Sequence, residues 1–394
     1  MKDFTITKII IGKFHFENFL VLLITFSYFI FSATSCIRPE KPEHVTTPYF
    51  FDLPSYFPTN YNIPEDNPMT VEGIKLGRYL FYDGRLSGRT HEDSLMSCAT
   101  CHRQERNFNV GTDHPKFPGG FPYGLSGTPT PHVPMPLVNM VFNHNGYFWN
   151  GMIHPSNDDA NKRLLEHTLW MGIVAPHEMF GDTTRTKKLI ASVDIYPPMF
   201  EAAFGSKDIT IERMGKAIAQ FIRSIVSYNS KFDRYIRGEE MLSEEELWGY
   251  ELFITEEGGD CFHCHGGAYS PLFTTNLFYN NGKDSLFTGE NDDPRDRYHV
   301  TFKEYDRGAY RAPSLRNVIY NAPYMHDGRF ETLDEVLDFY NFDVKLTNYT
   351  DVLMHHAYQG GVKLTPKETE ALKAFLMTLT DETVTTEEEY SNPF

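Results

Sequence analysis

The sequence is poor in cysteine, in positive charge and in long apolar runs. It has five cysteines among 394 residues, and 36 lysines and arginines against 53 aspartates and glutamates. The resulting net charge of −17 argues against nucleic acid as a partner, because its phosphates need a basic patch. The mostly apolar run at residues 19–31 is too short to span a bilayer. Strand signals are also sparse, so we expect a mainly α-helical protein.

Four of the five cysteines fall in two Cys-x-x-Cys-His motifs. Two thiols at this spacing can add to the two vinyl groups of one haem, while the adjacent histidine ligates the iron. The alternative is structural zinc, but the two Cys-x-x-Cys pairs of a zinc site usually lie only about 15 to 20 residues apart. The sequence therefore predicts two covalently bound c-type haems. Their attachment residues would be Cys98, Cys101 and His102 for one, and Cys261, Cys264 and His265 for the other.

The N-terminus has the features of a bacterial lipoprotein signal peptide. Three lysines precede the apolar run, and small residues lead to Cys36. We expect residues 1–36 to direct export to the periplasm, with a lipid on Cys36 as the only contact with a membrane. Ordinary cleavage nearby, with an unmodified thiol, is the alternative. With Cys36 lipidated and four cysteines on haem, none is left for a disulfide.

Composition divides the rest of the chain. Residues 37–68, rich in Pro, Tyr and Phe, predict an extended tether that finishes by packing onto the body. We expect two haem domains, 69–238 and 239–382, and an acidic tail at 383–394 that is mobile. Apolar residues at helical spacing predict helices near 70–81, 161–170, 209–238, 242–253 and 364–380. Residues 111–136, dense in Gly and Pro, predict a long functional loop.

The second half also repeats features of the first. PLVNMVFNHNGYFWNG (136–151) and PSLRNVIYNAPYMHDG (313–328) share Pro, Asn-x-x-aromatic-Asn, Tyr and a final Gly, and each follows a haem motif. This order indicates duplication of a one-haem unit. Copies that differ in detail can hold haems with different tasks.

Several segments resemble the bacterial di-haem cytochrome c peroxidases and their MauG-like relatives. They include LGRYLFYDGRLSG before Cys98, FWNG at 148, HEM at 177 and APSLRNVIYNAPYMHDGRF at 312. The resemblance covers about residues 65–380. It implies two helical cytochrome c-like domains with the haems flanking their interface. It also implies an open, peroxide-binding haem on His102 and a six-coordinate, electron-transferring haem on His265.

The resemblance gives two side chains a role in catalysis. Glu178 would move a proton between the peroxide oxygens; the alternative is a solvated loop carboxylate. Trp149 would lie between the haems and shorten electron tunnelling. Its alternative, a core tryptophan with a satisfied N–H, is compatible with that role.

The sixth ligand of the second haem has two candidates. Met325 is one, because thioethers ligate c-type haem iron. The family's axial methionine, however, corresponds to Tyr340, where MauG-like members carry tyrosine. A phenolate favours higher iron oxidation states, so the two irons could share an oxidation. Tyr340 as a core aromatic, with the iron five-coordinate or held by another side chain, is the alternative.

The sequence departs from the family pattern beside Glu178. The family's glutamine falls at Thr168, or at His167 with slippage, and its proline falls at Gly172. The histidine that blocks the peroxide-binding haem in some members is not at its expected position, although His114 and His132 lie in the same loop. If neither ligates, the enzyme should need no prior reduction.

Calcium is a further cofactor that the resemblance leaves open. The family's calcium-binding asparagine falls at Val133, while the backbone carbonyls of Asn321 and Pro323 could still serve.

The sequence thus predicts an exported di-haem peroxidase that reduces hydrogen peroxide to water with electrons from a small cytochrome c or cupredoxin. An acidic surface suits a basic redox partner. The alternatives are a MauG-like oxidase that modifies a protein or peptide through high-valent haems, and a non-catalytic electron-transfer cytochrome. The electron donor and a homodimeric state stay open.

Overall fold

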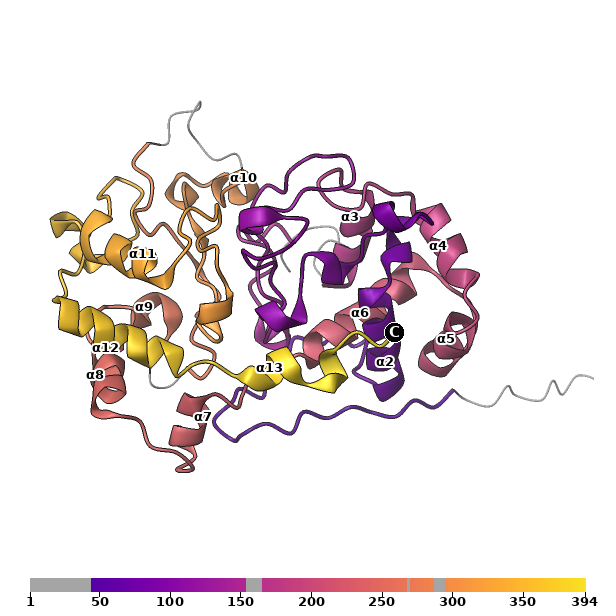
Figure 1. Ribbon diagram of the computed structural model, residues 1–394, viewed down its shortest axis with the longest axis horizontal. Coiled ribbons are helices and arrows are strands. Elements are labelled where there is room, and N and C mark those ends of the chain that lie inside the picture. Colours follow the sequence, from indigo (N-terminus) through magenta and orange to yellow (C-terminus); the bar gives the residue numbers. More distant parts are fainter. Residues whose placement is uncertain (1–43, 154–164, 268–269, 287–294) are drawn as a thin grey trace, which may run out of the picture. The chain divides into compact units, whose positions relative to one another are not determined.

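The computed structural model describes residues 44–153, 165–267, 270–286 and 295–394 (Figure 1). Thr46–Phe394 form one compact unit. The predicted signal peptide, Cys36 and the first part of the tether lie outside the described residues. Within these described ranges, none of the helices has the length and apolarity needed to cross a membrane.

The fold is mainly α-helical with long irregular connections, as predicted. The single sheet seen in the described ranges pairs β1 (Phe278–Tyr279) antiparallel to β2 (Tyr310–Arg311). A π-helix at Phe339–Asp343 directly follows α11. The α-helices are α2 (Val71–Tyr82), α3 (Thr168–Val174), α4 (Thr183–Ala191), α5 (Tyr196–Phe204), α6 (Ile211–Ser224), α7 (Lys231–Ile236), α8 (Glu244–Phe253), α9 (Phe262–His265), α10 (Tyr298–Thr301), α11 (Leu333–Asp338), α12 (Pro366–Met377) and α13 (Glu382–Thr386).

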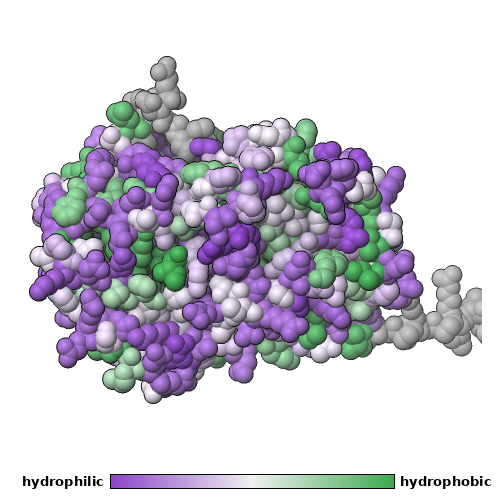
Figure 2. Space-filling model, in the orientation of Figure 1, coloured by the Kyte–Doolittle hydropathy of each residue, from purple (hydrophilic) through white to green (hydrophobic). Residues whose placement is uncertain are grey.

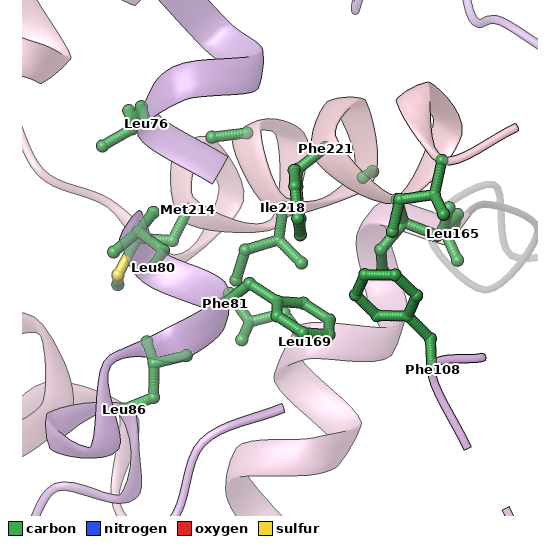
Figure 3. Packing of buried hydrophobic residues seen from close by; sticks show 14 of the residues in the cluster. Leu76, Leu80, Phe81, Leu86, Phe108, Leu165, Leu169, Met214, Ile218 and Phe221 are labelled. Atoms are coloured by element: carbon green, nitrogen blue, oxygen red, sulfur yellow. The ribbon is translucent and has the colours of Figure 1, made fainter. Parts of the chain in front are cut away.

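The core of the first half forms where α2 crosses α6. Apolar side chains at helical spacing on both helices face each other, and Leu80 and Phe81 pack with Ile218 and Phe221 (Figure 3). The crossing is close because Gly77 has no side chain. A Cβ atom there would lie 1.9 Å from the carbonyl oxygen of Ala217 and 2.9 Å from Cβ of Phe221.

The second half repeats this crossing with α8 and α12, which lie side by side (Figure 1). A Cβ atom on Gly249 would lie 1.8 Å from the carbonyl oxygen of Ala371 and 2.9 Å from Cβ of Phe375. Glycine therefore faces an alanine and a phenylalanine four residues apart in both halves. This is the duplication that the sequence predicted.

The repeated segments also fold alike. Asn139 and Asn317 both take a left-handed conformation, with φ of 62° and 58°, and each starts a short 3-10 turn. The side-chain oxygen of Asn139 accepts a hydrogen bond from the Ser227 N–H after α6. That of Asn317 accepts one from the Asp381 N–H after α12. Asparagine is suited to both tasks, since it tolerates this backbone and caps nearby N–H groups.

The apolar cores change over between Ile225 and Phe232. Phe232 of α7 packs with the second core, although the predicted domain boundary puts α7 in the first domain. The domain limits themselves stay a prediction.

The two ends of the body pack more closely than expected. Phe57, in the predicted tether, is buried against Phe142 and Leu272, so packing begins well before residue 68. The expectation of a mobile acidic tail is wrong: Val384 and Tyr390 are buried in the core of the first half. Tyr82 Oη donates to the carbonyl oxygen of Tyr390 at 2.7 Å. These two apolar residues anchor the acidic segment, and its overall composition did not predict their burial.

Candidate functional site

The first Cys-x-x-Cys-His motif lies after α2, on a short 3-10 turn at Cys98–Thr100. His102 Nδ1 is 2.8 Å from the carbonyl oxygen of Phe108. Since a carbonyl can only accept, Nδ1 carries the proton and Nε2 keeps its lone pair. Burial lowers the pKa of His102, which keeps the ring neutral. This is the state in which an imidazole ligates a metal.

The second motif forms α9, and His265 is held in the same way. Its Nδ1 is 3.1 Å from the carbonyl oxygen of Pro313, and burial lowers its pKa to about 4. The thiols of both motifs are free, and burial raises their pKa values to about 12, so they are protonated. Each motif therefore presents two thiols and one neutral imidazole.

Each motif opens into its own cavity, lined mainly by apolar side chains. The N-terminal cavity is lined by Cys98, Cys101 and His102, and the C-terminal cavity by Cys261, Cys264 and His265. Val133, Trp149 and Arg311 line both, so the cavities share a wall. A buried apolar cavity with paired thiols and an imidazole held through Nδ1 fits a haem.

Glu178 lies in the N-terminal cavity. Its side chain is partly accessible because it faces this cavity, and desolvation raises its pKa from 4.5 to about 7. A Cβ atom on Gly172 of α3 would lie 2.8 Å from Oε2 of Glu178, so glycine makes room for the carboxylate. At this position, where the family carries proline, glycine leaves the space that the carboxylate of Glu178 occupies.

The neighbours of Glu178 separate the two candidates for the family's glutamine. Thr168 lines the N-terminal cavity, whereas the ring of His167 packs beside Trp170, with centroids 5.3 Å apart. His177 also lines the cavity, and burial lowers its pKa. Sequence reasoning missed His177, although it stands directly before Glu178 in the HEM segment.

Of the two loop histidines, His132 lines the N-terminal cavity. His114 is turned elsewhere: its Nδ1 accepts hydrogen bonds from the backbone N–H groups of Lys116 and Phe117, and its ring stacks on Phe117. The structure therefore brings His132 and Glu178 to one cavity and leaves His114 out.

Trp149 lies in the wall between the cavities. Its Nε1 donates to the carbonyl oxygen of Val133 at 2.9 Å, so its N–H is satisfied. The ring of His326 lies 6.4 Å from that of Trp149. Tyr310 stacks on His326, with centroids 3.5 Å apart. Neither His326 nor Tyr310 was singled out from the sequence.

Tyr340 and Met325, the two candidates for the sixth ligand of the second haem, both line the C-terminal cavity. Asn281 Nδ2 donates to Tyr340 Oη at 3.0 Å and lies 3.9 Å from Met325 Sδ. Tyr340 lies in the π-helix, a feature often found at functional sites. Burial raises the pKa of Tyr340. The two side chains thus share one amide donor.

The expected calcium residues also line the C-terminal cavity. The backbone oxygen of Asn321 accepts from Asn109 Nδ2 at 3.3 Å, and Oδ1 of Asn321 accepts from Asn107 Nδ2 at 3.0 Å. Val133 is buried, and its N–H donates to the His326 carbonyl oxygen. Calcium at Asn321 and Pro323 stays a prediction.

Residues 71–241 match the family described as di-haem cytochrome c peroxidase. The chain is 32% identical over 308 residues to cytochrome-c peroxidase IdrP1 of Pseudomonas sp. (strain SCT), covering 71% of this chain and 74% of that one. It is also 32% identical over 279 residues to the methylamine utilization protein MauG of Methylorubrum extorquens, covering 70% of each chain. The chain belongs to the di-haem cytochrome c peroxidase and MauG family. Its cofactors are accordingly haems.

Solved structures agree with this assignment. A MauG-like protein associated with microbial copper homeostasis is 30% identical and superposes with a TM-score of 0.73, covering 88% of this chain and 99% of that one. The di-haem peroxidase BthA of Burkholderia thailandensis, 19% identical with a TM-score of 0.64 over 89% and 95% of the two chains, shares the fold.

Proposed function

We propose that this member of the family is a peroxidase that reduces hydrogen peroxide with electrons from a small redox protein. One peroxide takes up two electrons and two protons and yields two water molecules. The observation that carries the proposal is Glu178, a carboxyl group with a pKa near 7 in the same cavity as His102. Such a group can accept and return a proton at neutral pH.

We further propose that the thiols of each motif bind a haem covalently, with His102 and His265 as the iron ligands. The free thiols, the two imidazoles held through Nδ1 and the two apolar cavities support this. When bound, the haems supply the redox chemistry that cleaves the O–O bond and stores the oxidising equivalents. Haem that stays on the denatured chain, at two groups per chain, would support covalent attachment. Haem that is extracted by acid and organic solvent would contradict it.

The two cavities support different tasks for the two sites. Glu178, His177 and Thr168 place polar groups in the N-terminal cavity, where a peroxide would be bound and a proton moved. The C-terminal cavity has Tyr340 and Met325, either of which could be the sixth ligand of a haem iron bound there. Trp149, in the shared wall, would pass electrons between them.

The decisive test is Glu178→Gln, which keeps the shape of the side chain and removes its titratable proton. We expect peroxide turnover to fall by roughly 10²- to 10⁴-fold, the usual contribution of a positioned acid-base group, with both haems retained. Glu105→Gln is the matched control. Glu105 is an exposed carboxylate that pairs with Arg103 and lies close to the first Cys-x-x-Cys-His motif. Equal turnover in the two variants would remove the role of Glu178.

A MauG-like oxidase that modifies a protein or peptide is the second candidate. Tyr340, whose hydroxyl group is held in the C-terminal cavity by Asn281, favours it. Addition of one equivalent of peroxide to the diferric protein separates the two. A long-lived oxidised spectrum without an added donor favours the oxidase, and rapid turnover with a small cytochrome favours the peroxidase. No reaction with peroxide would contradict both.

Export to the periplasm and a lipid on Cys36 are part of the proposal. The sequence of residues 1–36 supports them. Figure 2 shows a face covered mainly by hydrophilic residues, with hydrophobic ones in small separate patches. Together with the net charge of −17, this supports a basic donor that is guided by electrostatic attraction. Membrane-bound material that Cys36→Ser releases in soluble form would support the lipid.

A further inference from the structure

A cluster of possible metal ligands lies beside the second haem motif, outside the residues assigned so far. Glu256, His263 and His355 each offer one ligand atom, and these atoms all lie within 4.8 Å of one another. His263 stands between Cys261 and Cys264, whereas His355 comes from a 3-10 turn at His355–Gln359. Two segments far apart in the sequence therefore build this cluster.

Asp260 hydrogen-bonds to one imidazole of the cluster and lies close to the other. Its carboxylate is only 5% exposed; Oδ1 is 2.7 Å from Nδ1 of His263, and Oδ2 is 3.4 Å from Nδ1 of His355. A proton on Nδ1 of His263 leaves Nε2 as the ligand atom, and this nitrogen lies 3.8 Å from Oε1 of Glu256. At zinc sites, the ring nitrogen of a ligating histidine that faces away from the metal commonly donates to a carboxylate.

The protein itself fixes the distance between the two segments. His356 Nε2 lies 2.7 Å from the carbonyl oxygen of Glu256, and Gln359 Nε2 lies 3.1 Å from Nδ1 of His356. These bonds tie the turn that carries His355 to the loop that carries Glu256. The two segments are therefore held together before any ion binds, while the Glu256 side chain is 60% exposed.

We propose that Glu256, His263 and His355 form a binding site for a divalent transition metal ion of the zinc class. Two imidazoles and one carboxylate suit Zn²⁺ or Cu²⁺, whereas Ca²⁺ and Mg²⁺ prefer oxygen ligands throughout. Three protein ligands leave a fourth position for water or for a side chain of a partner. Asp260 and His355 also line the C-terminal cavity, so the ion binds at the edge of the second haem site.

The site can be tested by titrating the purified, EDTA-treated holoprotein with Zn²⁺ against a chromogenic chelator. We expect one Zn²⁺ per chain with an affinity above that of the acidic surface. Glu256→Gln and His355→Ala should each weaken this binding at least tenfold, corresponding to about 1.4 kcal/mol. Glu256 does not line the C-terminal cavity, so its variant separates loss of metal from any disturbance of the haem.

The matched control is His91→Ala. His91 also lies beside a carboxylate, with Nδ1 3.5 Å from Asp93, but its side chain is 78% exposed and belongs to no three-ligand cluster in the described ranges. It should leave Zn²⁺ binding unchanged. Absence of a one-to-one site, or equal binding by all three variants, would overturn the proposal. Because the readout is metal binding, its failure would not affect the proposed peroxidase.

Discussion

Trp149 and His326 occupy the same position in the two repeated segments, and their rings meet in the wall between the cavities, with centroids 6.4 Å apart at an angle of 66°. Tyr310 extends this contact by stacking on His326 at 14°. Trp149 lines both cavities, whereas His326 and Tyr310 line the C-terminal one. The duplication has therefore brought two equivalent side chains together, one as tryptophan and one as histidine.

This arrangement predicts that Trp149 carries electrons between the sites. Trp149→Leu should slow electron transfer between the haems, because an aliphatic side chain lacks the polarisable ring. Peroxide turnover should fall with it, while Trp149→Phe keeps part of the rate. Rapid-mixing spectroscopy of the half-reduced protein measures the transfer directly.

Trp170 provides the control for this experiment. Trp170 lies on α3, is 45% exposed, packs against His167 and lines neither cavity. Trp170→Leu should leave the transfer rate unchanged. An equal rate in Trp149→Leu and the wild-type protein would show that electrons take another path.

The proposed role of Glu178 predicts a pH dependence. Desolvation raises its pKa to about 7, so below this pH the carboxyl group is protonated and cannot accept a proton from peroxide. We expect kcat/KM for peroxide to rise as pH increases through about 7 and then to level off. The residual rate of Glu178→Gln should not show this rise. A variant that keeps the same inflection would assign it to another group, of which His177 is the nearest in sequence.

Many of the residues that line the candidate site could be predicted because they stand in local motifs. The cysteines of the two motifs, His102, His265 and Glu178 each belong to a short segment whose spacing or resemblance predicts its role. Asn281 could not be found in this way. It lies 59 residues before Tyr340, and only the folded chain brings its amide to that hydroxyl group.

The acidic tail is another case in which contacts between distant parts of the chain could not be predicted from the sequence. Its acidic composition predicts exposure, but burial is decided by Val384 and Tyr390, which fit the first core from the far end of the chain. The metal cluster combines residues about 100 positions apart, and no sequence pattern links Glu256 to His355. The predicted helices near 70–81, 242–253 and 364–380 are present as α2, α8 and α12, because apolar spacing is a local signal; Ser243 and Glu246 also form a capping box at the start of α8. The helix predicted over 209–238 is instead divided into α6 and α7.

The sixth ligand of the second haem can be decided by paired substitutions. Tyr340→Phe removes the hydroxyl group that Asn281 contacts, and Met325→Leu removes the neighbouring sulfur atom. If the phenol ligates, Tyr340→Phe should change the absorption and EPR spectra of the second haem and Met325→Leu should not. The opposite result would assign the ligand to Met325. Unchanged spectra in both variants would exclude both side chains.

The two glycine crossings predict that each half depends on its own helix pair. Gly249→Ala would force a Cβ atom to within 1.8 Å of the Ala371 carbonyl oxygen, so α8 and α12 must move apart. Overpacking of this kind typically costs about 1–3 kcal/mol. Since α8 leads into the second motif, we expect a lower unfolding midpoint and a smaller amount of haem bound at Cys261 and Cys264. Gly77→Ala should do the same to the first half.

Gly267→Ala controls for the loss of a glycine near the second motif, because a Cβ atom there would meet its neighbours at 3.5 Å or more. Haem mapped to each motif by mass spectrometry of proteolytic fragments would distinguish the halves. If Gly249→Ala depleted haem equally at both motifs, the halves would fold as one unit. If it depleted neither and left the unfolding midpoint unchanged, the close crossing would not limit the fold. Loss confined to the second motif would show that each duplicated unit still forms its haem site by itself.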